Sequence, residues 1–270
     1  MIGFTALYLV THDDFCLAES CNMLLEQNVK RFMFCVPRAY WNGTLVSLKE
    51  EQEIKGIVAK LERQGAKVRI IRPPSISKGL YAEKETKSRN LALREIDRWT
   101  RSHNHVIILD GDELMKPGSI NILENSWYDH QQRATTMKSL DIVGFPGYPV
   151  NSVKEGLLVH VWTKYAEFSY ARCVNTVAHP LDHSGVIHFT STRRTREESI
   201  AKHLQSSHYD DIDNYDFDGW LKNKFPKLVP GERDCHMFKH YQIWDSVRNF
   251  TEAEWRSIPD RLKQYLGAPE

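Results

Sequence analysis

Apolar and polar residues follow one another in blocks along the first 115 residues, and the blocks predict alternating strands and helices. Four apolar runs rich in β-branched and aromatic residues are typical of buried strands. The segments between them place apolar residues three or four positions apart, which predicts amphipathic helices. The expected strands are residues 4–10, 31–36, 67–71 and 105–109, and the expected helices cover 17–25, 54–61 and, after a loop at 75–84, 85–99. This order favours a Rossmann-type α/β sandwich, with a mostly parallel central sheet and helices on both faces.

The pattern changes after Pro117. Shorter runs rich in β-branched and aromatic residues replace the regular alternation and predict a mixed α+β extension. The expected strands are residues 156–161, 165–172, 174–179 and 185–190, and residues 141–150 combine strand and turn. The expected helices are residues 120–130, 196–206, 241–249 and 252–265. No repeat, low-complexity tract or long linker interrupts the chain. We therefore expect a single domain of residues 1–270, in which the second half, 116–270, extends the sheet of the first half, 1–115.

Composition narrows the class of protein. The chain has 270 residues, of which 41% are hydrophobic and 26% charged, and its net charge is +1, so no global field favours nucleic acid or a membrane surface. Five scattered cysteines without a Cys-x-x-Cys pair argue against a disulfide framework or a cysteine zinc site and favour a reducing compartment. The apolar N-terminal run lacks basic residues and is too short for a signal peptide or a membrane span. We expect a cytoplasmic protein with no membrane span.

Three carboxylates stand at the end of the fourth predicted strand, in the sequence Asp110-Gly111-Asp112-Glu113. Hard divalent cations take carboxylate oxygens, and a bound polyphosphate supplies further ligands. Ligands of open α/β sheets bind beyond the carboxyl ends of the strands, where this motif is expected to lie. The motif therefore predicts a metal and phosphate site, and the alternative is a polar surface turn.

The helix before the acidic strand carries an arginine near its start, in the sequence Ser88-Arg89-Asn90-Leu91-Ala92-Leu93. An arginine in this place can bind a phosphate bidentately beside a metal held by the carboxylates. A solvated helix residue is the alternative interpretation of Arg89.

An Arg-Asn-x-Ala-Leu helix start followed by an apolar strand ending in Asp-x-Asp-Glu resembles the nucleotide-sugar half of GT-A fold glycosyltransferases of family 2. The resemblance implies that residues 1–115 bind the nucleotide-sugar donor, a UDP-sugar being favoured, and that 116–270 form the acceptor side. It implies Mn²⁺ or Mg²⁺ against the donor diphosphate, with Asp112 as the direct metal ligand and Asp110 on the ribose or the metal. Arg89 would lie near the donor, as would Thr11 and Asp13 after the first strand.

A second block, Gly185-Val186-Ile187-His188-Phe189-Thr190-Ser191 followed by Ile200, Lys202 and His208, resembles the "Trp-His-Phe-Ser … Ile-x-x-Lys … His" block of family 17 N-acetylglucosaminyltransferases. Its isoleucine and lysine are one residue closer than in that pattern. The resemblance implies that His188 completes the metal shell and that Lys202 contacts the donor. A structural histidine after a strand is the alternative interpretation of His188.

Two features of family 2 are missing. An aspartate-rich turn that contacts the base usually follows the second strand, whereas here the turn contains Tyr40 and Trp41, either of which could stack on a base instead. The usual Glu-Asp pair that supplies the catalytic base is absent as well. Inversion at an anomeric carbon still requires a group that accepts the proton of the acceptor hydroxyl. Asp182 is our candidate, against the alternative of a turn aspartate that caps the backbone.

Three other groups of residues have both a functional and a structural interpretation. His236 and His240, four residues apart beside Cys235, could bind a metal on a helix, but no third ligand stands at a known spacing. The basic stretch of Arg193, Arg194, Arg196 and Lys202 could bind donor phosphates or an anionic acceptor, such as nucleic acid or a phosphorylated glycan, or be a solvated helix start. The aromatic residues at 215–220 could stack on a sugar or pack in the core.

The sequence thus predicts a metal-dependent, inverting glycosyltransferase, transferring a hexose or pentose from a nucleotide-sugar to an unknown acceptor, either a glycan or a modified DNA base. A nucleotidyltransferase is one alternative, although no glycine-rich, lysine-containing phosphate loop follows the first strand. The other is a nucleotide-sugar or glycan-binding protein without catalytic activity.

Overall fold

The structure is a computed structural model of residues 1–270. It describes residues 3–10, 16–40, 43–74, 80–100, 105–130, 133–143, 150–164, 166–170, 172–189, 192–195, 197–198, 201–202, 223 and 248–266.

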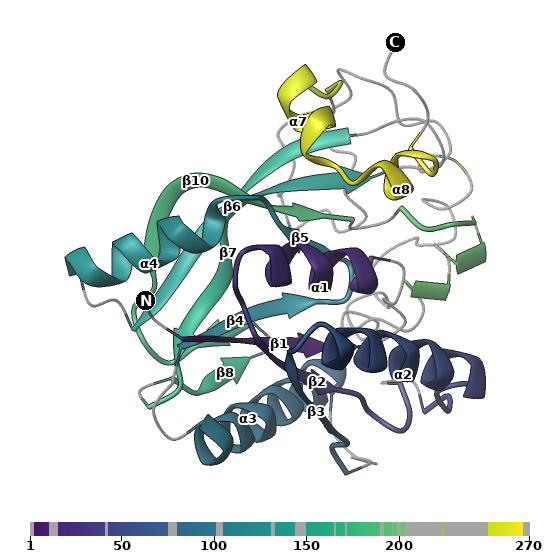
Figure 1. Ribbon diagram of the computed structural model, residues 1–270, viewed down its shortest axis with the longest axis vertical. Coiled ribbons are helices and arrows are strands. Elements are labelled where there is room, and N and C mark those ends of the chain that lie inside the picture. Colours follow the sequence, from purple (N-terminus) through teal and green to yellow (C-terminus); the bar gives the residue numbers. More distant parts are fainter. Residues whose placement is uncertain are drawn as a thin grey trace.

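One curled eight-stranded sheet forms the centre of the molecule (Figure 1). Its strand order is β3-β2-β1-β4-β7-β6-β10-β5. The first four strands are parallel, β7 is antiparallel to both of its neighbours, β10 is parallel to β6, and β5 is antiparallel to β10. The strands are β1 (Phe4–Leu9), β2 (Arg31–Cys35), β3 (Lys67–Ile71), β4 (His105–Asp110), β5 (Glu113–Met115), β6 (Ala134–Val143), β7 (Val150–Trp162) and β10 (His179–His188). Six strands therefore run in one direction and two in the other.

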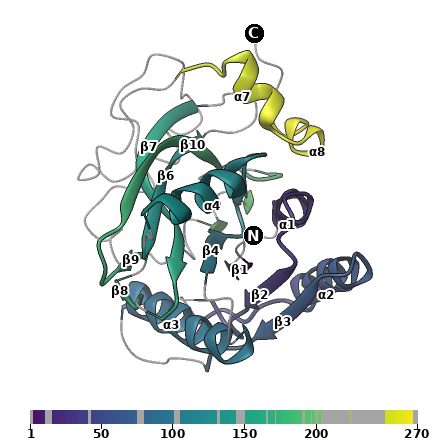
Figure 2. The ribbon, with the colours of Figure 1, turned by 60° about the vertical axis from the view of Figure 1, so that its left-hand side comes forward.

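Helices cover both faces of this sheet (Figures 1 and 2). One core lies between the sheet and α1 (Leu17–Glu26), α2 (Leu48–Arg63) and α4 (Ser119–His130). On the opposite face, α3 (Tyr81–Thr100) packs together with a small hairpin of β8 (Phe168–Tyr170) and β9 (Cys173–Val174). The expected mostly parallel sheet with helices on both faces is confirmed.

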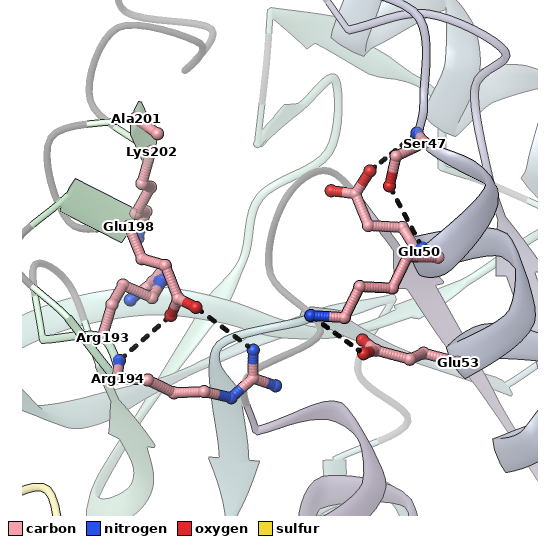
Figure 3. Close-up of a pocket in the computed structure, with 9 residues that line it drawn as sticks. Ser47, Glu50, Glu53, Arg193, Arg194, Glu198, Ala201 and Lys202 are labelled. Carbon is pink, nitrogen blue, oxygen red and sulfur yellow. Dashed lines mark hydrogen bonds and ion pairs between the residues drawn. The ribbon is translucent and has the colours of Figure 1, made fainter.

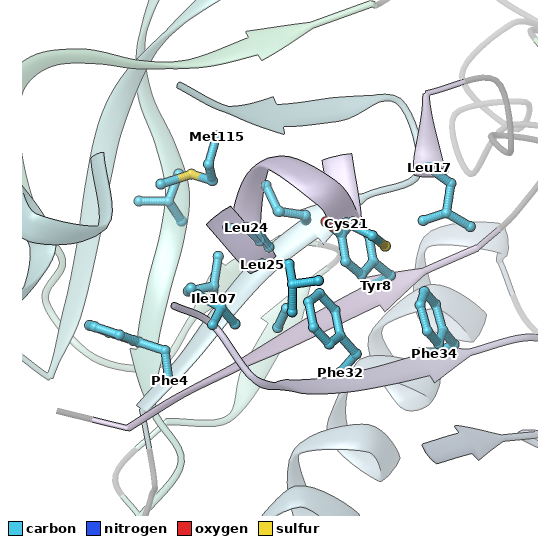
Figure 4. Packing of buried hydrophobic residues seen from close by; sticks show 14 of the residues in the cluster. Phe4, Tyr8, Leu17, Cys21, Leu24, Leu25, Phe32, Phe34, Ile107 and Met115 are labelled. Carbon is cyan, nitrogen blue, oxygen red and sulfur yellow. The ribbon is translucent and has the colours of Figure 1, made fainter. Parts of the chain in front are cut away.

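Alternate residues of the parallel strands face the two cores, because successive side chains of a strand point to opposite faces. Tyr8 and Phe34 stack at 5.6 Å between ring centroids on the α1 face, beside Leu24 and Ile107 (Figure 4). Leu7, their neighbour on β1, faces α3 instead. The apolar runs of β1, β2 and β4 arise because both faces of these strands are buried, whereas the edge strand β3 is partly exposed.

A third core joins the C-terminal helices α7 (Glu252–Ser257) and α8 (Asp260–Lys263) to the far edge of the sheet, where β5, β6 and β10 lie. One closing helix was expected over 252–265. Pro259 divides it, because proline disfavours helical dihedrals in the residue before it, and Ile258 is extended at φ −82° and ψ 130°. None of the described helices is long and apolar enough to cross a membrane.

Other boundaries differ from the expectation. The third helix begins at Tyr81 instead of 85, and Thr86 already donates to the Ala82 carbonyl within it. Strand β9 (Cys173–Val174) shares only Val174 with the strand expected at 174–179. Residues 180–184, expected as a turn, belong to β10. They pair with β6 through two register shifts, an irregular pairing that leaves no alternation to detect in the sequence.

Candidate active site

The motif Asp110-Gly111-Asp112-Glu113 links the end of β4 to the start of β5. The Asp110 N–H donates to Glu113 Oε2 at 2.9 Å, and the Phe189 N–H donates to the Asp112 carbonyl at 2.9 Å. Asp112 and Glu113 are 1% and 0% exposed. A polar surface turn is therefore excluded, and the motif buries charges that other groups must neutralise.

Arg89 neutralises Asp110. It projects from α3 with 1% of its surface exposed, donates from Nη2 to Asp110 Oδ1 at 2.7 Å, and donates from Nε and Nη2 to Glu85 Oε1 at 3.0 and 2.9 Å. Burial would raise the pKa of Asp110, but the charges of Arg89 and Arg172 lower it. Arg89 is thus not a solvated helix residue.

Arg172, at the turn of the β8–β9 hairpin, is the second cation on this side of the motif. Its Nη1 donates to Asp110 Oδ2 at 3.4 Å and to Glu113, and its Nη2 donates to the carbonyls of Ile108 and Leu158 at 2.9 and 3.0 Å. The sequence pattern predicts Arg172 only as the last residue of a strand over 165–172. No local pattern indicates its role, because its partners belong to other strands.

Asp112 contacts three cationic side chains. Arg193 Nη2 donates to Asp112 Oδ2 at 2.9 Å, Lys202 donates to the same oxygen, and His188 Nε2 lies 3.6 Å from it. Burial would raise the pKa of Asp112, but the charges of Lys202, His188 and Arg193 hold that pKa well below its usual range. Arg193 is itself buried and also donates to the carbonyls of Phe189 and Thr192 at 2.6 and 2.7 Å.

Strand pairing brings His188 to the motif. It is the last residue of β10 and lies opposite Glu113 on β5 and opposite Asp141 on β6. Its Nδ1 is 3.3 Å from Asp141 Oδ1, which also accepts a hydrogen bond of 2.8 Å from Ser139 Oγ. Burial would lower the pKa of His188, but Asp112 and Asp141 raise it to about 10.

Asp112 and His188 fit a shared divalent cation. Two ligands about 2.1 Å from one ion lie roughly 3–3.6 Å apart at angles of about 90–120°, and Asp112 Oδ2 and His188 Nε2 are 3.6 Å apart. A buried carboxylate on the other ring nitrogen, here that of Asp141, is the usual support of a metal-binding histidine. Asp110, the third expected ligand, is held by Arg89 and Arg172 instead.

Across the described part of the chain, no group of three histidine, cysteine, aspartate or glutamate side chains forms a metal site. With Asp112 and His188 as its ligands, a cation would have further coordination positions that phosphate or water can fill, as they commonly do for Mg²⁺.

The structure does not bring the other candidates to this cluster. Asp182 lies six residues before His188 on β10, about 20 Å along an extended strand, and its exposed carboxylate pairs with Lys138 at 2.6 Å. Tyr40 is buried and donates to Glu50, so it offers no open face to a base. Several candidates lie outside the described residues: Thr11, Asp13, Trp41, Arg196, His208, 215–220, His236 and His240.

No protein-family model matches the sequence, and no curated protein matches it significantly. Among solved structures, residues 1–349 of TarS from S. aureus in complex with UDP-GlcNAc are similar at a TM-score of 0.46 and 14% identity, covering 83% of this chain and 70% of that chain. The same TarS fragment in complex with UDP gives 0.43 and 11%, covering 81% and 77%. The inositol-1-phosphate CTP transferase from T. maritima gives 0.36 and 13%, covering 61% and 72%. At most 14% of residues are identical in these three comparisons.

Proposed function

We propose that this protein is a metal-dependent glycosyltransferase that transfers a sugar from a nucleotide-sugar, with a UDP-sugar as the favoured donor. The observation that carries the proposal is the environment of Asp112: a buried carboxylate that meets His188, Arg193 and Lys202 beyond the end of a central strand. Such a site offers one position for a divalent cation and two permanent positive charges for phosphate oxygens. The Asp-x-Asp-Glu and His-Lys blocks, which resemble those of families 2 and 17, meet in this site.

Each side chain has a part in donor binding. Asp112 and His188 would hold Mn²⁺ or Mg²⁺, which stabilises the negative charge of the departing diphosphate when bound. Lys202 and Arg193 would exchange part of their contact with Asp112 for the phosphate oxygens. Asp110, oriented by Arg89 and Arg172, is placed to accept a hydrogen bond from a ribose hydroxyl.

A protonated His188 must lose its proton before it binds a metal, so cation binding and proton release are coupled. We further propose inversion at the anomeric carbon, which the resemblance to family 2 implies. Chemical-shift analysis of the product's anomeric proton distinguishes inversion from retention.

A donor panel tests the proposal. The full chain is incubated with UDP-, GDP- and TDP-sugars, with and without Mn²⁺, and the released nucleoside diphosphate is measured. We expect slow, metal-dependent hydrolysis of one donor class. Absence of metal-dependent hydrolysis and binding for every sugar donor would overturn the proposal, and turnover of nucleoside triphosphates instead would indicate a nucleotidyltransferase.

Two variants locate the activity. Asp112→Asn and His188→Gln should each abolish metal-dependent donor binding, while Asp260→Asn, which changes an exposed carboxylate on α8, should not. His188→Gln provides a second test if Asp112→Asn folds poorly. Wild-type donor affinity in both site variants would contradict the assigned roles.

A further inference from the structure

A pocket of about 260 Å³ lies between the N-terminal turns of α2 and the segment around residues 193–202 (Figure 3). Every lining residue except Ala201 has a polar or charged side chain. The lining residues are Ser47, Lys49, Glu50, Glu53, Arg193, Arg194, Glu198, Ala201 and Lys202. Arg193 and Lys202 also hold Asp112. The pocket therefore adjoins the proposed diphosphate site through two shared side chains.

The charges around this pocket balance. Lys49 faces Glu53 at 3.9 Å, and Arg194 pairs with Glu198 at 3.6 Å and also donates its N–H to that carboxylate at 3.1 Å. Arg193 and Lys202 share Asp112. With Asp112 and the connected pair of His188 and Asp141 included, five cations stand against five carboxylates among the described residues. Arg193 and Lys202 are assigned to the donor diphosphate, and the other described cations of the pocket, Lys49 and Arg194, pair with Glu53 and Glu198. Among the described residues no further positive charge is left to favour nucleic acid or a phosphorylated glycan.

Glu50 has a structural task. Its two carboxylate oxygens accept hydrogen bonds from the Ser47 N–H, at 2.8 Å, and from the Tyr40 hydroxyl. Together with the bond from the Glu50 N–H to Ser47 Oγ, this forms a capping box that starts α2. It fixes the wall of the pocket from which Glu53 projects.

Glu53 and Glu198, from opposite walls, are suited to binding hydroxyl groups. Their side chains are 36% and 40% exposed. An ionised carboxylate has about four acceptor positions and therefore accepts hydrogen bonds beyond its ion pair. The cations beside them can donate to hydroxyl and ring oxygens. Carboxylates and cations in balance match a ligand that is uncharged and rich in hydroxyl groups.

We propose that this pocket is an acceptor subsite that binds one uncharged sugar unit. The proposal rests on the proposed function, because it takes the neighbouring Asp112 site as the position of the donor diphosphate. Small-molecule sites usually measure roughly 300–1,000 Å³, and this smaller pocket suits a single ring better than a whole nucleotide-sugar. The acceptor is accordingly a neutral glycan and not a nucleic acid.

Binding of simple probes tests the ligand class. Saturation-transfer NMR on the full chain, without donor, is carried out with methyl glycosides of glucose, galactose, mannose and N-acetylglucosamine, and separately with inorganic phosphate and a short single-stranded DNA. We expect at least one methyl glycoside to bind, and neither anion to displace it. No binding by any glycoside, or displacement by phosphate or DNA, would overturn the proposal.

Matched variants locate the binding. Glu53→Gln and Glu198→Gln remove the charge at constant size and should each weaken glycoside binding at least five-fold. The controls are Glu62→Gln, also on α2, and Glu197→Gln, beside Glu198; both side chains are exposed and lie outside the pocket. Equal affinity in the pocket and control variants would place the sugar elsewhere and contradict the proposal.

The donor assay on the same preparations separates this proposal from the proposed function. Donor hydrolysis without glycoside binding would overturn the proposed acceptor subsite and leave the proposed transferase function standing. Glycoside binding that depends on Glu53 and Glu198 without any donor hydrolysis would support the ligand class and overturn the transferase.

Discussion

The two ends of β4 both bury polar side chains, but in opposite ways. At the N-terminal end, His105 and His160 are 9% and 2% exposed, stack at 5.3 Å and share a hydrogen bond of 3.1 Å. Trp127 and Trp162 pack against His105 at 4.4 and 5.7 Å between ring centroids. At the C-terminal end, Asp110 begins the acidic motif, whose charges meet three arginines, a lysine and a histidine.

The difference shows which buried polar groups are available for function. Burial and the neighbouring His105 lower the pKa of His160 to about 3, so His160 stays neutral. Its ring nitrogens form hydrogen bonds with His105 and Thr135. The acidic end keeps its charges because they compensate one another, and a metal or a phosphate can take the place of either partner. The proposed function accordingly assigns binding to the end with compensated buried charge, whereas packing accounts for the buried neutral polarity at the other end.

Removal of a compensating cation should produce the largest effect. Arg172→Met removes a positive charge beside Asp110 and beside Glu113, which is 0% exposed. It also removes the hydrogen bonds to the carbonyls of Ile108 and Leu158. Breaking a buried pair by removing one partner costs about 3–5 kcal/mol, and we expect a loss of that size in the free energy of urea unfolding. Arg94→Met, on the exposed face of α3, is the control and should change it by less than about 0.5 kcal/mol. Equal unfolding midpoints for the two variants would mean that the acidic end does not depend on charge compensation.

The next largest effect should be on metal affinity, when the carboxylate that supports His188 loses its charge. Asp141→Asn removes the negative charge that faces Nδ1 at 3.3 Å. Loss of such a supporting carboxylate typically weakens metal affinity about 10–100-fold, which the electron paramagnetic resonance signal of free Mn²⁺ measures directly. Lys138→Gln, on the same strand but paired with the exposed Asp182, should leave the affinity unchanged. Wild-type Mn²⁺ affinity in Asp141→Asn would remove Asp141 from the site.

The buried His160 at the N-terminal end of β4 should contribute to the pH dependence of stability. Unfolded His160 takes up a proton near its usual pKa of 6.5, whereas the folded side chain does so only near 3. The unfolded state therefore binds more protons in this window, and stability falls as the pH decreases from 6.5 toward 3. His160→Gln should remove roughly 1 kcal/mol of this loss between pH 6.5 and 5.5. Val161→Ala, a destabilising core change on the same strand, should keep the wild-type slope; an unchanged slope in His160→Gln would show that His160 is not kept neutral.

The parts of the fold that the sequence predicts are those where one physical pattern dominates. The sequence predicts β1, β2 and β4 within one residue, because both faces of these strands are covered and their sequences are mostly apolar. It also predicts β3, an edge strand with exposed residues, from its β-branched Val68, Ile70 and Ile71. By contrast, β5 has three residues, too few to show a period, and β10 pairs through register shifts. Tertiary pairing decides these strands, not local sequence.

The residues of the candidate site also fall into two groups, those that the sequence predicts and those that only tertiary pairing brings to the site. Arg89, Asp112, His188 and Lys202 belong to ordered sequence blocks, and the structure places all four around the acidic motif. Arg172 and Asp141 could not be found from the sequence. Arg172 binds carbonyls of strands 64 and 14 positions away along the chain, and Asp141 meets His188 only because β6 and β10 are neighbours.

Asp182 provides the prediction with the smallest expected effect. Its carboxylate is exposed at 91% and pairs with Lys138, whose hydrogen bond and charge lower the pKa of Asp182. An exposed ion pair contributes little to stability, and this one lies away from both ends of β4. Asp182→Asn should therefore leave the unfolding midpoint, Mn²⁺ affinity and donor hydrolysis as in the wild type, because none of these depends on a proton acceptor on that part of β10. Loss of transfer to an acceptor with unchanged donor hydrolysis would instead assign the catalytic base to Asp182, and would mean that the acceptor reaches along β10 from the charged end of β4.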